Sequence, residues 1–170
     1  HGIFYSVADV PNGSHDQTIA VVGGGSSALA NVLALAPIAK KVHLIHRRDS
    51  FRGEEVLVEK LKAYKNVVYH MAANVVGVAG GDHLQAITIE PNNEKIDVDV
   101  LVVAIGYHAQ SEWVREFVLC DDKGAIATNK FAETNMTGAF AAGDCTDCEY
   151  KQIPISSGEG ATAAIRAYQY

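Results

Sequence analysis

Hydrophobic positions in the first third of the chain switch between a strand-like and a helix-like pattern. A β-branched run at 18–22 leads through three glycines into an Ala- and Leu-rich stretch from Ser26 to about Ala36. These patterns predict a strand and then a helix, followed by a second strand at 41–46 and a second helix at about 53–64. Two strands that flank a helix within about 30 residues predict a right-handed βαβ unit with a parallel sheet.

Shorter apolar runs follow the second helix. A third strand is expected at 67–70, and Gly and Pro-Asn-Asn breaks separate the runs after it. Those runs are 74–78, 84–90 and 95–98. Such close spacing predicts an antiparallel meander. The run 100–105 is continuously apolar and ends at Gly106, which is typical of a strand covered on both faces.

The last third of the chain has a different pattern. Polar and charged residues from 110 to 129 indicate a connection between structural units. A short strand at 139–142, a turn at Gly143-Asp144 and a final helix from about Ser157 to Tyr168 are expected beyond it. The fold class is therefore α/β, with a Rossmann-like parallel sheet, an antiparallel meander and a smaller second part.

Composition narrows the class of protein. The 170 residues include 14 Lys and Arg against 20 Asp and Glu, a net charge of −6, so we expect no nucleic-acid partner. Every apolar run is shorter than the roughly 20 residues of a membrane span, so we expect no membrane partner either. No signal segment is recognisable, and three cysteines are too few for a disulfide framework. We therefore expect a soluble, cytoplasmic protein.

Residues 23–28, Gly-Gly-Gly-Ser-Ser-Ala, form a G-x-G-x-x-A pattern between the first strand and the first helix. Gly23 permits the tight turn, Gly25 lets a pyrophosphate approach the backbone, and Ala28 lets the helix pack closely on the strand. The free amides of Ser26 and Ser27, at the positive end of the helix dipole, are expected to face the anion. The alternative is an ordinary strand-to-helix turn.

The end of the second strand indicates which dinucleotide binds. NAD-binding units usually carry Asp or Glu there, whereas this chain has His46 followed by three arginines within six residues. The arginines are Arg47, Arg48 and Arg52, and we expect them to bind the cofactor together with His46. Guanidinium groups match a phosphate dianion, so the cluster favours NADP(H) over NAD(H). The alternative is a solvated basic turn that pairs with Glu54 and Glu55.

Together with two later segments, these motifs resemble the NADPH-dependent flavoproteins of the thioredoxin reductase type. The later segments are 133–144, Glu-Thr-Asn-Met-Thr-Gly-Ala-Phe-Ala-Ala-Gly-Asp, and 150–153, Tyr-Lys-Gln-Ile. That group includes the thioredoxin-reductase-like ferredoxin-NADP reductases. The resemblance implies an FAD enzyme whose NADPH domain, here about 1–110, is inserted into the FAD domain, of which 119–170 would be the closing segment.

The resemblance also implies flavin contacts. Asp144 would bind the ribityl chain of FAD, and Lys151, Gln152 and Ile153, with the helix entered at Ser157, would lie against the flavin ring. Gly106 ends the last strand of the nucleotide-binding unit and is expected near the nicotinamide. No residue is a convincing catalytic acid, base or nucleophile, and the histidines show no metal-binding spacing, which fits hydride transfer between NADPH and FAD.

The chain departs from this family in two ways. It has one glycine fingerprint where the family has two, so we expect it to retain FAD poorly. The redox Cys-x-x-Cys of thioredoxin reductases is replaced within Tyr5–Asp9 by residues that cannot exchange disulfides. This favours a ferredoxin-NADP reductase, with ferredoxin or flavodoxin as partner, and we expect the full-length protein to be a homodimer.

Two alternatives stay open. Cys145 and Cys148 form a Cys-x-x-Cys that could serve a thioredoxin or other disulfide reductase. The chain could also be an NADPH-binding module without catalysis of its own. If 119–170 is the closing segment of an FAD domain, we expect apolar surface on the 139–142 strand and the last helix.

Overall fold

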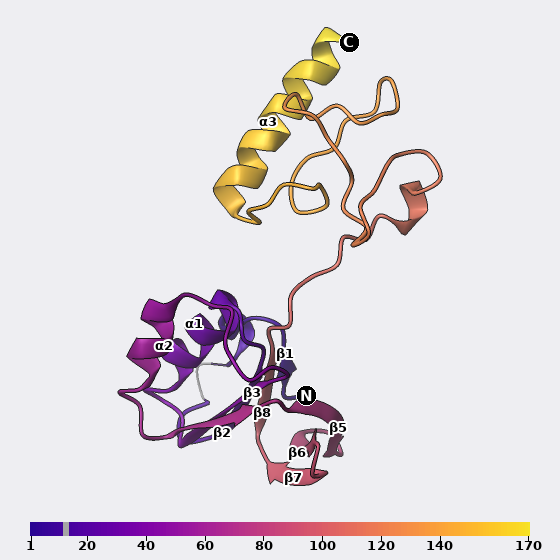
Figure 1. Cartoon of the computed structure of the whole chain (residues 1–170). Coiled ribbons are helices and arrows are strands. Elements are labelled where there is room, and N and C mark those ends of the chain that lie inside the picture. The colour runs from indigo at the N-terminus through magenta and orange to yellow at the C-terminus, as the bar shows by residue number, and fades with distance from the viewer. Residues whose placement is uncertain (12–13) are drawn as a thin grey trace. The chain divides into compact units, whose positions relative to one another are not determined.

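The computed structural model describes residues 1–11 and 14–170. They form two compact units, His1–Gly106 and Tyr107–Tyr170, which are described separately below (Figure 1). Among these residues, no helix is both long and apolar enough to cross a membrane.

The first unit is built on a five-stranded sheet with the order β1-β8-β2-β3-β4. The strands are β1 (Ile3–Phe4), β2 (Thr18–Val22), β3 (Lys41–His46), β4 (Val67–Met71) and β8 (Val100–Val103). All neighbouring pairs are parallel, and β2 lies in the centre between β8 and β3. The carboxyl ends of β2, β3 and β8 therefore meet at one edge of the sheet. The predicted parallel sheet is confirmed.

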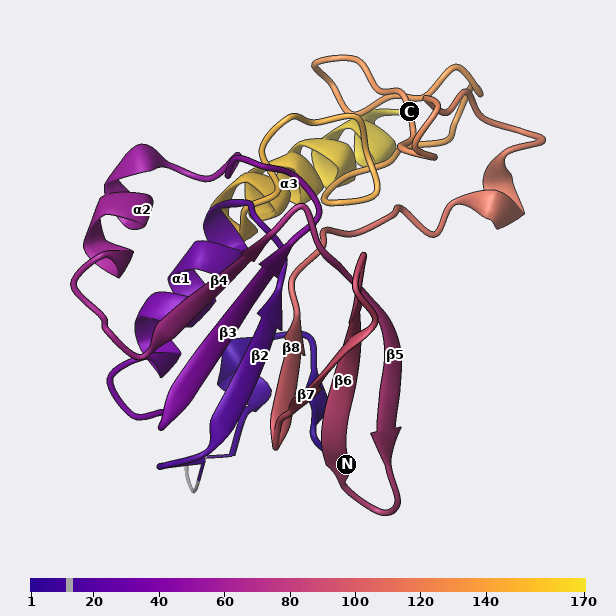
Figure 2. The ribbon, with the colours of Figure 1, turned by 60° about the horizontal axis from the view of Figure 1, so that its bottom comes forward.

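Two helices, α1 (Ser26–Leu35) and α2 (Glu55–Leu61), cover one face of this sheet (Figure 2). Leu29, Val32 and Leu35 of α1 pack with Val21 and Leu44 of the sheet, and all five are almost fully buried. The apolar positions of α1 therefore face the strands that precede and follow it, as the βαβ pattern predicted.

The opposite face of the parallel sheet is covered by an antiparallel sheet with the order β5-β6-β7. Its strands are β5 (Asn74–Gly80), β6 (Leu84–Glu90) and β7 (Glu94–Asp97). Ile87 and Ile96 from these strands share a buried cluster with Ala20, Ile45 and Leu101 of the parallel sheet. The predicted meander is confirmed, and it closes the second core of the unit.

Two elements of the first unit are shorter than predicted. β8 ends at Val103, and α2 covers Glu55–Leu61 instead of about 53–64. The amides of Arg52 and Gly53 donate to the carbonyl of Gly24 instead of entering a helix, at 2.8 and 3.0 Å. The helix therefore begins only after this loop has been fixed to the glycine turn.

The second unit contains a 3-10 turn, η2 (Glu112–Val114), and one long helix, α3 (Ile153–Gln169). The prediction of a strand at 139–142 is wrong, because no strand forms there. Phe140 forms a single bridge with Glu133, while Ala139 and Ala141 pair with loop residues around it. No neighbouring strand is present within the described part of this unit, so the apolar run has no ladder to join.

Helix α3 begins at Ile153, four residues before the predicted start at Ser157. Pro154 lies in the first turn, where its missing amide costs nothing, and Ser156 already donates to the carbonyl of Gln152 at 2.9 Å. Gly158 and Gly160 lie inside the helix, as predicted. The free amides of the helix N-terminus therefore lie next to Gln152, and Ser157 belongs to the second turn.

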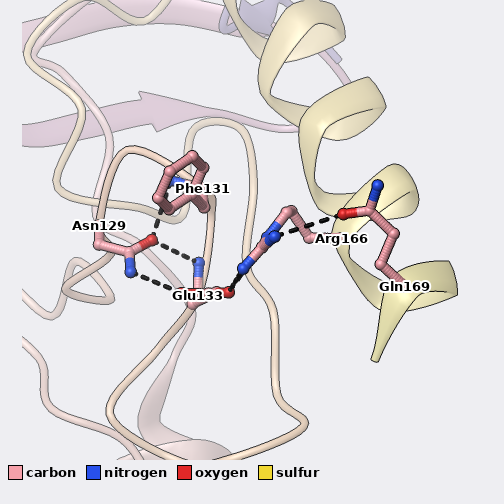
Figure 3. Close-up of polar contacts among 5 residues, drawn as sticks. All are labelled: Asn129, Phe131, Glu133, Arg166 and Gln169. Carbon is pink, nitrogen blue, oxygen red and sulfur yellow. Dashed lines mark hydrogen bonds and ion pairs between the residues drawn. The ribbon is translucent and has the colours of Figure 1, made fainter.

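A polar cluster joins α3 to the loop at 129–133 (Figure 3). The side chain of Asn129 accepts from the amides of Phe131 and Glu133 and donates to the Glu133 carboxylate at 2.7 Å. Arg166 of α3 donates to the same carboxylate through Nε at 3.1 Å and lies 4.8 Å over the Phe131 ring. Hydrogen bonds from Asn129 and Arg166 lower the pKa of Glu133. Polar contacts thus connect α3 to this loop.

Candidate functional site: the glycine turn and the arginine loop

The turn after β2 leaves no room for a side chain at Gly23. Its φ is +146°, and a Cβ atom there would lie 2.2 Å from the carbonyl oxygen of Ala104 and 2.9 Å from the Cβ of Ala28. The amide of Gly23 donates to Ile45 at 2.9 Å. The turn therefore passes tightly between the ends of β8, β3 and α1, and Gly23 and Ala28 are both needed for that packing.

Gly25, in contrast, faces open space. It is the N-cap of α1, and a Cβ atom there would meet nothing within 4 Å. The first bond of the helix runs from the amide of Leu29 to Gly25, so the amides of residues 26–28 have no carbonyl partner within the helix. Bare backbone and unused amides at a helix N-terminus are the features that hold a pyrophosphate.

The segment 47–54, called here the arginine loop, is fixed directly to this turn. Besides the two bonds from Arg52 and Gly53 to Gly24, the amide of Glu54 donates to the Ser26 hydroxyl at 3.2 Å. Gly53 lies so close to the start of α1 that a Cβ atom on it would be 2.9 Å from the Ser26 amide nitrogen. The loop and the turn are thus one structure, held mostly by backbone contacts.

The three arginine side chains of this loop are exposed. Among the described residues, ion pairs join Lys62 to Glu59 and Arg166 to Glu133, and none involves these arginines. The alternative in which they pair with Glu54 and Glu55 therefore finds no support. Their guanidinium groups are available for an anion at the same sheet edge as the free amides.

His46 and Gly106 occupy different environments at this edge. The His46 side chain is buried, with 5% of the residue exposed. Gly106 follows the end of β8, is exposed, and has a φ of +100° with nothing within 4 Å of a Cβ position. His46 is the last residue of β3, and Gly106 lies beyond the end of β8; these two strands flank β2, and sheets of this kind bind ligands at the carboxyl ends of their strands.

In the second unit the structure brings the four predicted flavin contacts together. Asp144, Lys151, Gln152 and Ile153 line one open pocket with Ser156 and Ser157. The Ser156 hydroxyl donates to the Asp144 carboxylate at 3.0 Å, and the Lys151 ammonium donates to the carbonyl of Thr146 at 2.5 Å. A turn and a helix N-terminus therefore converge on one polar surface.

The cysteines beside this pocket are free thiols. Cys145 donates to the carbonyl of Ala142 at 3.3 Å. A hydrogen bond to Glu159 raises the pKa of the Cys148 thiol, which disfavours the thiolate needed for disulfide exchange. No group of three or more potential metal ligands occurs in the described part of the chain.

Sequence reasoning missed the residues that join the loop to the turn: Gly24, Gly53 and the Ser26 hydroxyl. Gly24 is the unspecified position of the fingerprint. Gly53 directly follows the arginine cluster and belongs to no recognised motif. The one available signal was a glycine at each of these places. A glycine at the start of a predicted helix indicates a close backbone approach rather than a helical residue.

Comparisons with known proteins agree with this architecture. A family model described as pyridine nucleotide-disulphide oxidoreductase matches residues 4–160. The thioredoxin reductase of Mycoplasma genitalium is 38% identical over 155 residues, covering 88% of this chain and 49% of that protein. An alkyl hydroperoxide reductase component of Staphylococcus epidermidis is 34% identical over 159 residues, covering 91% of this chain and 31% of that protein.

Solved structures give the same result. The crystal structure of Lactococcus lactis thioredoxin reductase matches with a TM-score of 0.85 and 26% identity, covering 99% of this chain and 57% of that one. The chain thus spans about half the length of the thioredoxin reductases that it matches. The matched residues include both units, and the chain belongs to the pyridine nucleotide-disulphide oxidoreductase family, within which it resembles the thioredoxin reductase type.

Proposed function

We propose that the chain is the NADP(H)-binding part of a flavin-dependent oxidoreductase of the thioredoxin reductase type. The observation that carries this proposal is the attachment of the arginine loop to the glycine turn through the carbonyl of Gly24. The attachment puts unpaired guanidinium groups and free helix amides on one structural element. A pyrophosphate on the amides and a 2′-phosphate on the arginines would use both parts.

The nucleotide fits the residues that are present. Gly25 leaves the approach to the amides of Ser26 and Ser27 open. Arg47, Arg48 and Arg52 would hold the 2′-phosphate, and Gly106 would lie near the nicotinamide. The chain's own contribution is to bind and orient, because hydride transfer between nicotinamide and flavin is the chemistry of the two cofactors.

For the second unit we propose the flavin contacts of a closing FAD segment. Asp144, whose carboxylate is fixed by Ser156, would bind the ribityl chain. Lys151, Gln152 and Ile153 would lie along the ring, and the start of α3 at Ile153 puts the positive end of the helix dipole beside them. Residues 1–110 would then be the NADPH domain and 119–170 part of the FAD domain. Because we assign the ADP half of FAD to a second glycine fingerprint, we expect this chain alone to hold FAD weakly.

The electron acceptor is a separate part of the proposal. The similar proteins named above are thioredoxin reductases and an alkyl hydroperoxide reductase component, which favours the disulfide-reductase alternative over ferredoxin-NADP reductase. One observation still supports ferredoxin or flavodoxin: Ser6 and Asp9 occupy the position of the expected dithiol, and the Ser6 hydroxyl caps the 3-10 turn η1 (Val7–Asp9). Cys145 and Cys148 are the remaining dithiol candidate within this chain.

Replacing Arg47 and Arg48 together by Ala tests the nucleotide assignment. Loss of two charge-assisted contacts should weaken NADPH binding roughly 100-fold and NADH binding little, as measured by calorimetric titration. The matched control is the Lys60→Ala, Lys65→Ala pair, which removes two exposed charges from the same unit. Equal losses for NADPH and NADH would contradict the assignment.

The acceptor is tested on the flavin-containing protein to which the chain belongs. NADPH-dependent reduction of thioredoxin is compared with reduction of ferredoxin. Thioredoxin reduction that Cys148→Ser abolishes would assign the disulfide reaction to Cys145 and Cys148. Ferredoxin reduction that the same substitution leaves intact would restore the ferredoxin interpretation.

A further inference from the structure

His46 is the first residue of the basic segment, yet it differs from the arginines that follow. Only 5% of the residue is exposed, whereas Arg47, Arg48 and Arg52 are exposed. Its ring lies against Gly24, since a Cβ atom on Gly24 would be 2.3 Å from the ring carbon Cε1. The ring is therefore packed against the glycine turn rather than presented to solvent.

The same ring holds the arginine loop. Its Nε2 lies 3.1 Å from the carbonyl oxygen of Ser50, and because a carbonyl can only accept, Nε2 carries the proton of this bond. The ring also stacks on Phe51, with centroids 5.7 Å apart and planes 22° apart. The Phe51 ring in turn packs at a tilt on the Tyr69 ring of β4, with the ring centroids 6.2 Å apart. One imidazole thus contacts the glycine turn and the middle of the loop.

Gly24 contacts both the His46 ring and the far end of the arginine loop. The ring covers the Cα of Gly24, and the carbonyl of Gly24 accepts from Arg52 and Gly53 at the far end of the loop. The start of the loop is anchored as well, since Ala73 and Ala72 donate to the carbonyls of His46 and Arg48 at 3.0 and 2.9 Å. The distance between the arginines and the helix amides is therefore set by what packs on Gly24.

Burial and the neighbouring arginines favour the neutral form of the ring. Burial lowers the pKa of His46 most, and the neighbouring Arg48, Arg52 and Arg47 lower it further, against the bond to Ser50, which raises it. A neutral imidazole with its proton on Nε2 donates to Ser50 and presents uncharged ring atoms to Gly24. A buried, neutral ring of this kind is suited to support and not to phosphate binding.

We propose that His46 is a positioning residue: its ring fixes the arginine loop against Gly24 and so sets the preference for a nucleotide with a 2′-phosphate. This inference rests on the proposed function and refines it, because sequence reasoning placed His46 among the cofactor ligands. The free amides that hold the pyrophosphate belong to α1 and need no contact with His46. NADPH binding therefore depends on the ring, and NADH binding does not.

Two substitutions separate support from simple packing. His46→Leu keeps an apolar side chain but loses the donor to Ser50, and His46→Gln keeps an amide donor. By calorimetric titration of the whole chain, His46→Leu should weaken NADPH binding roughly tenfold and leave NADH binding unchanged. His46→Gln should restore most of the NADPH affinity. His15→Gln, an exposed histidine of the same unit, is the control.

If a variant fails to fold, the proposal can still be tested by a measurement on the unaltered chain. In nitrogen-15 spectra at pH 7, His46 should be a neutral ring protonated on Nε2, both with and without NADP⁺. Conversion to the doubly protonated form when NADP⁺ is added would show a phosphate ligand and overturn the proposal. Unchanged preference for NADPH in His46→Leu would overturn it as well.

Failure of this inference can be told from failure of the proposed function. If the unaltered chain binds NADPH and NADH equally or binds neither, the proposed function fails. If it prefers NADPH and both His46 variants keep that preference, the role of His46 alone is wrong.

Discussion

The two units of this chain are stabilised in different ways. In His1–Gly106, a central parallel sheet is covered on both faces, and each face has its own apolar core. In Tyr107–Tyr170, the buried apolar residues are few, and α3 buries none of its side chains. The buried apolar residues of this second unit are Val118, Ile126 and Ala132. The first unit can therefore be stable on its own packing, whereas the second depends on turns and on the Glu133–Arg166 contact.

The same contrast applies to the candidate sites. The candidate nucleotide site lies at the ends of buried strands, where backbone hydrogen bonds fix the arginine loop to the glycine turn. The pocket of the second unit lies beside a helix whose Ile153, Ile165 and Tyr168 are exposed. Apolar surface on the last helix was expected from the sequence and is confirmed.

Core substitutions should show this contrast most strongly. Leu44 of β3 is fully buried, so Leu44→Ala should lower the free energy of unfolding of the first unit by about 3 kcal/mol. Ile165→Ala on the exposed face of α3 should change stability by less than about 0.5 kcal/mol. Urea unfolding followed by circular dichroism measures both. Equal losses would show that α3 is packed as tightly as the sheet.

Glycines of the turn should separate stability from binding. Gly23→Ala introduces a Cβ atom 2.2 Å from the Ala104 carbonyl and should cost about 2 kcal/mol of stability. Gly25→Ala meets open space and should leave stability nearly unchanged while weakening NADPH binding. Thermal unfolding and nucleotide titration of both variants check this. Retained nucleotide affinity in Gly25→Ala would argue against a pyrophosphate at that amide edge.

The first unit should also lose stability in acid because of His43. Its Nδ1 lies 2.9 Å from Nε2 of His70, on the sheet face covered by β5-β6-β7. Burial above all, then His70 and Lys41, lower the pKa of His43 from 6.5 to about 4, with Glu94 acting in the opposite direction. The unfolded chain therefore takes up this proton first as the pH falls below 6.5.

Because the unfolded state binds the proton more tightly, the free energy of unfolding should fall by roughly 2 kcal/mol between pH 6.5 and pH 4. Chemical denaturation at several pH values should show this slope, and His43→Gln should remove most of it. His15→Gln, at an exposed position, should leave the slope as it is. A slope that His43→Gln does not alter would assign the acid sensitivity to other groups.

The smallest effect is expected at the polar cluster of the second unit. Arg166→Ala removes a partly exposed ion pair and the contact with Phe131, and should cost about 1 kcal/mol or less in that unit. Hydrogen exchange of α3 amides should report the loss. Arg115→Ala, an exposed arginine of the same unit, is the control. A loss as large as that of Leu44→Ala would mean that polar contacts can stabilise this unit as strongly as a core.

The sequence allowed most of the first unit to be predicted and less of the second. Strands such as 18–22 and 41–46 are recognisable as mostly apolar runs because both of their faces are buried, and Gly23 and Ala28 lie where close packing requires them. The prediction of a strand at 139–142 was wrong because four apolar residues do not reveal whether a partner strand exists. The predicted start of α3 was four residues too late because Pro154 in the sequence is as typical of a loop as of a first helical turn.

The residues of the candidate nucleotide site could be named from the sequence, but their arrangement could not. The arginines and glycines carry recognisable chemistry. Their connection through Gly24, Gly53 and His46 depends on backbone bonds and one buried ring, for which the sequence has no distinctive pattern. The acceptor was predicted from missing cysteines, and the relatives favour the alternative that the same reasoning had kept open.

Hydrogen–deuterium exchange of the chain, measured with and without saturating NADP⁺, tests the central claim most directly. We predict added protection in the amides of 23–28 and 46–54, and none in 107–170. Protection confined to the second unit, or no change in the glycine turn and the arginine loop when NADP⁺ is bound, would contradict the assignment of nucleotide binding to the first unit.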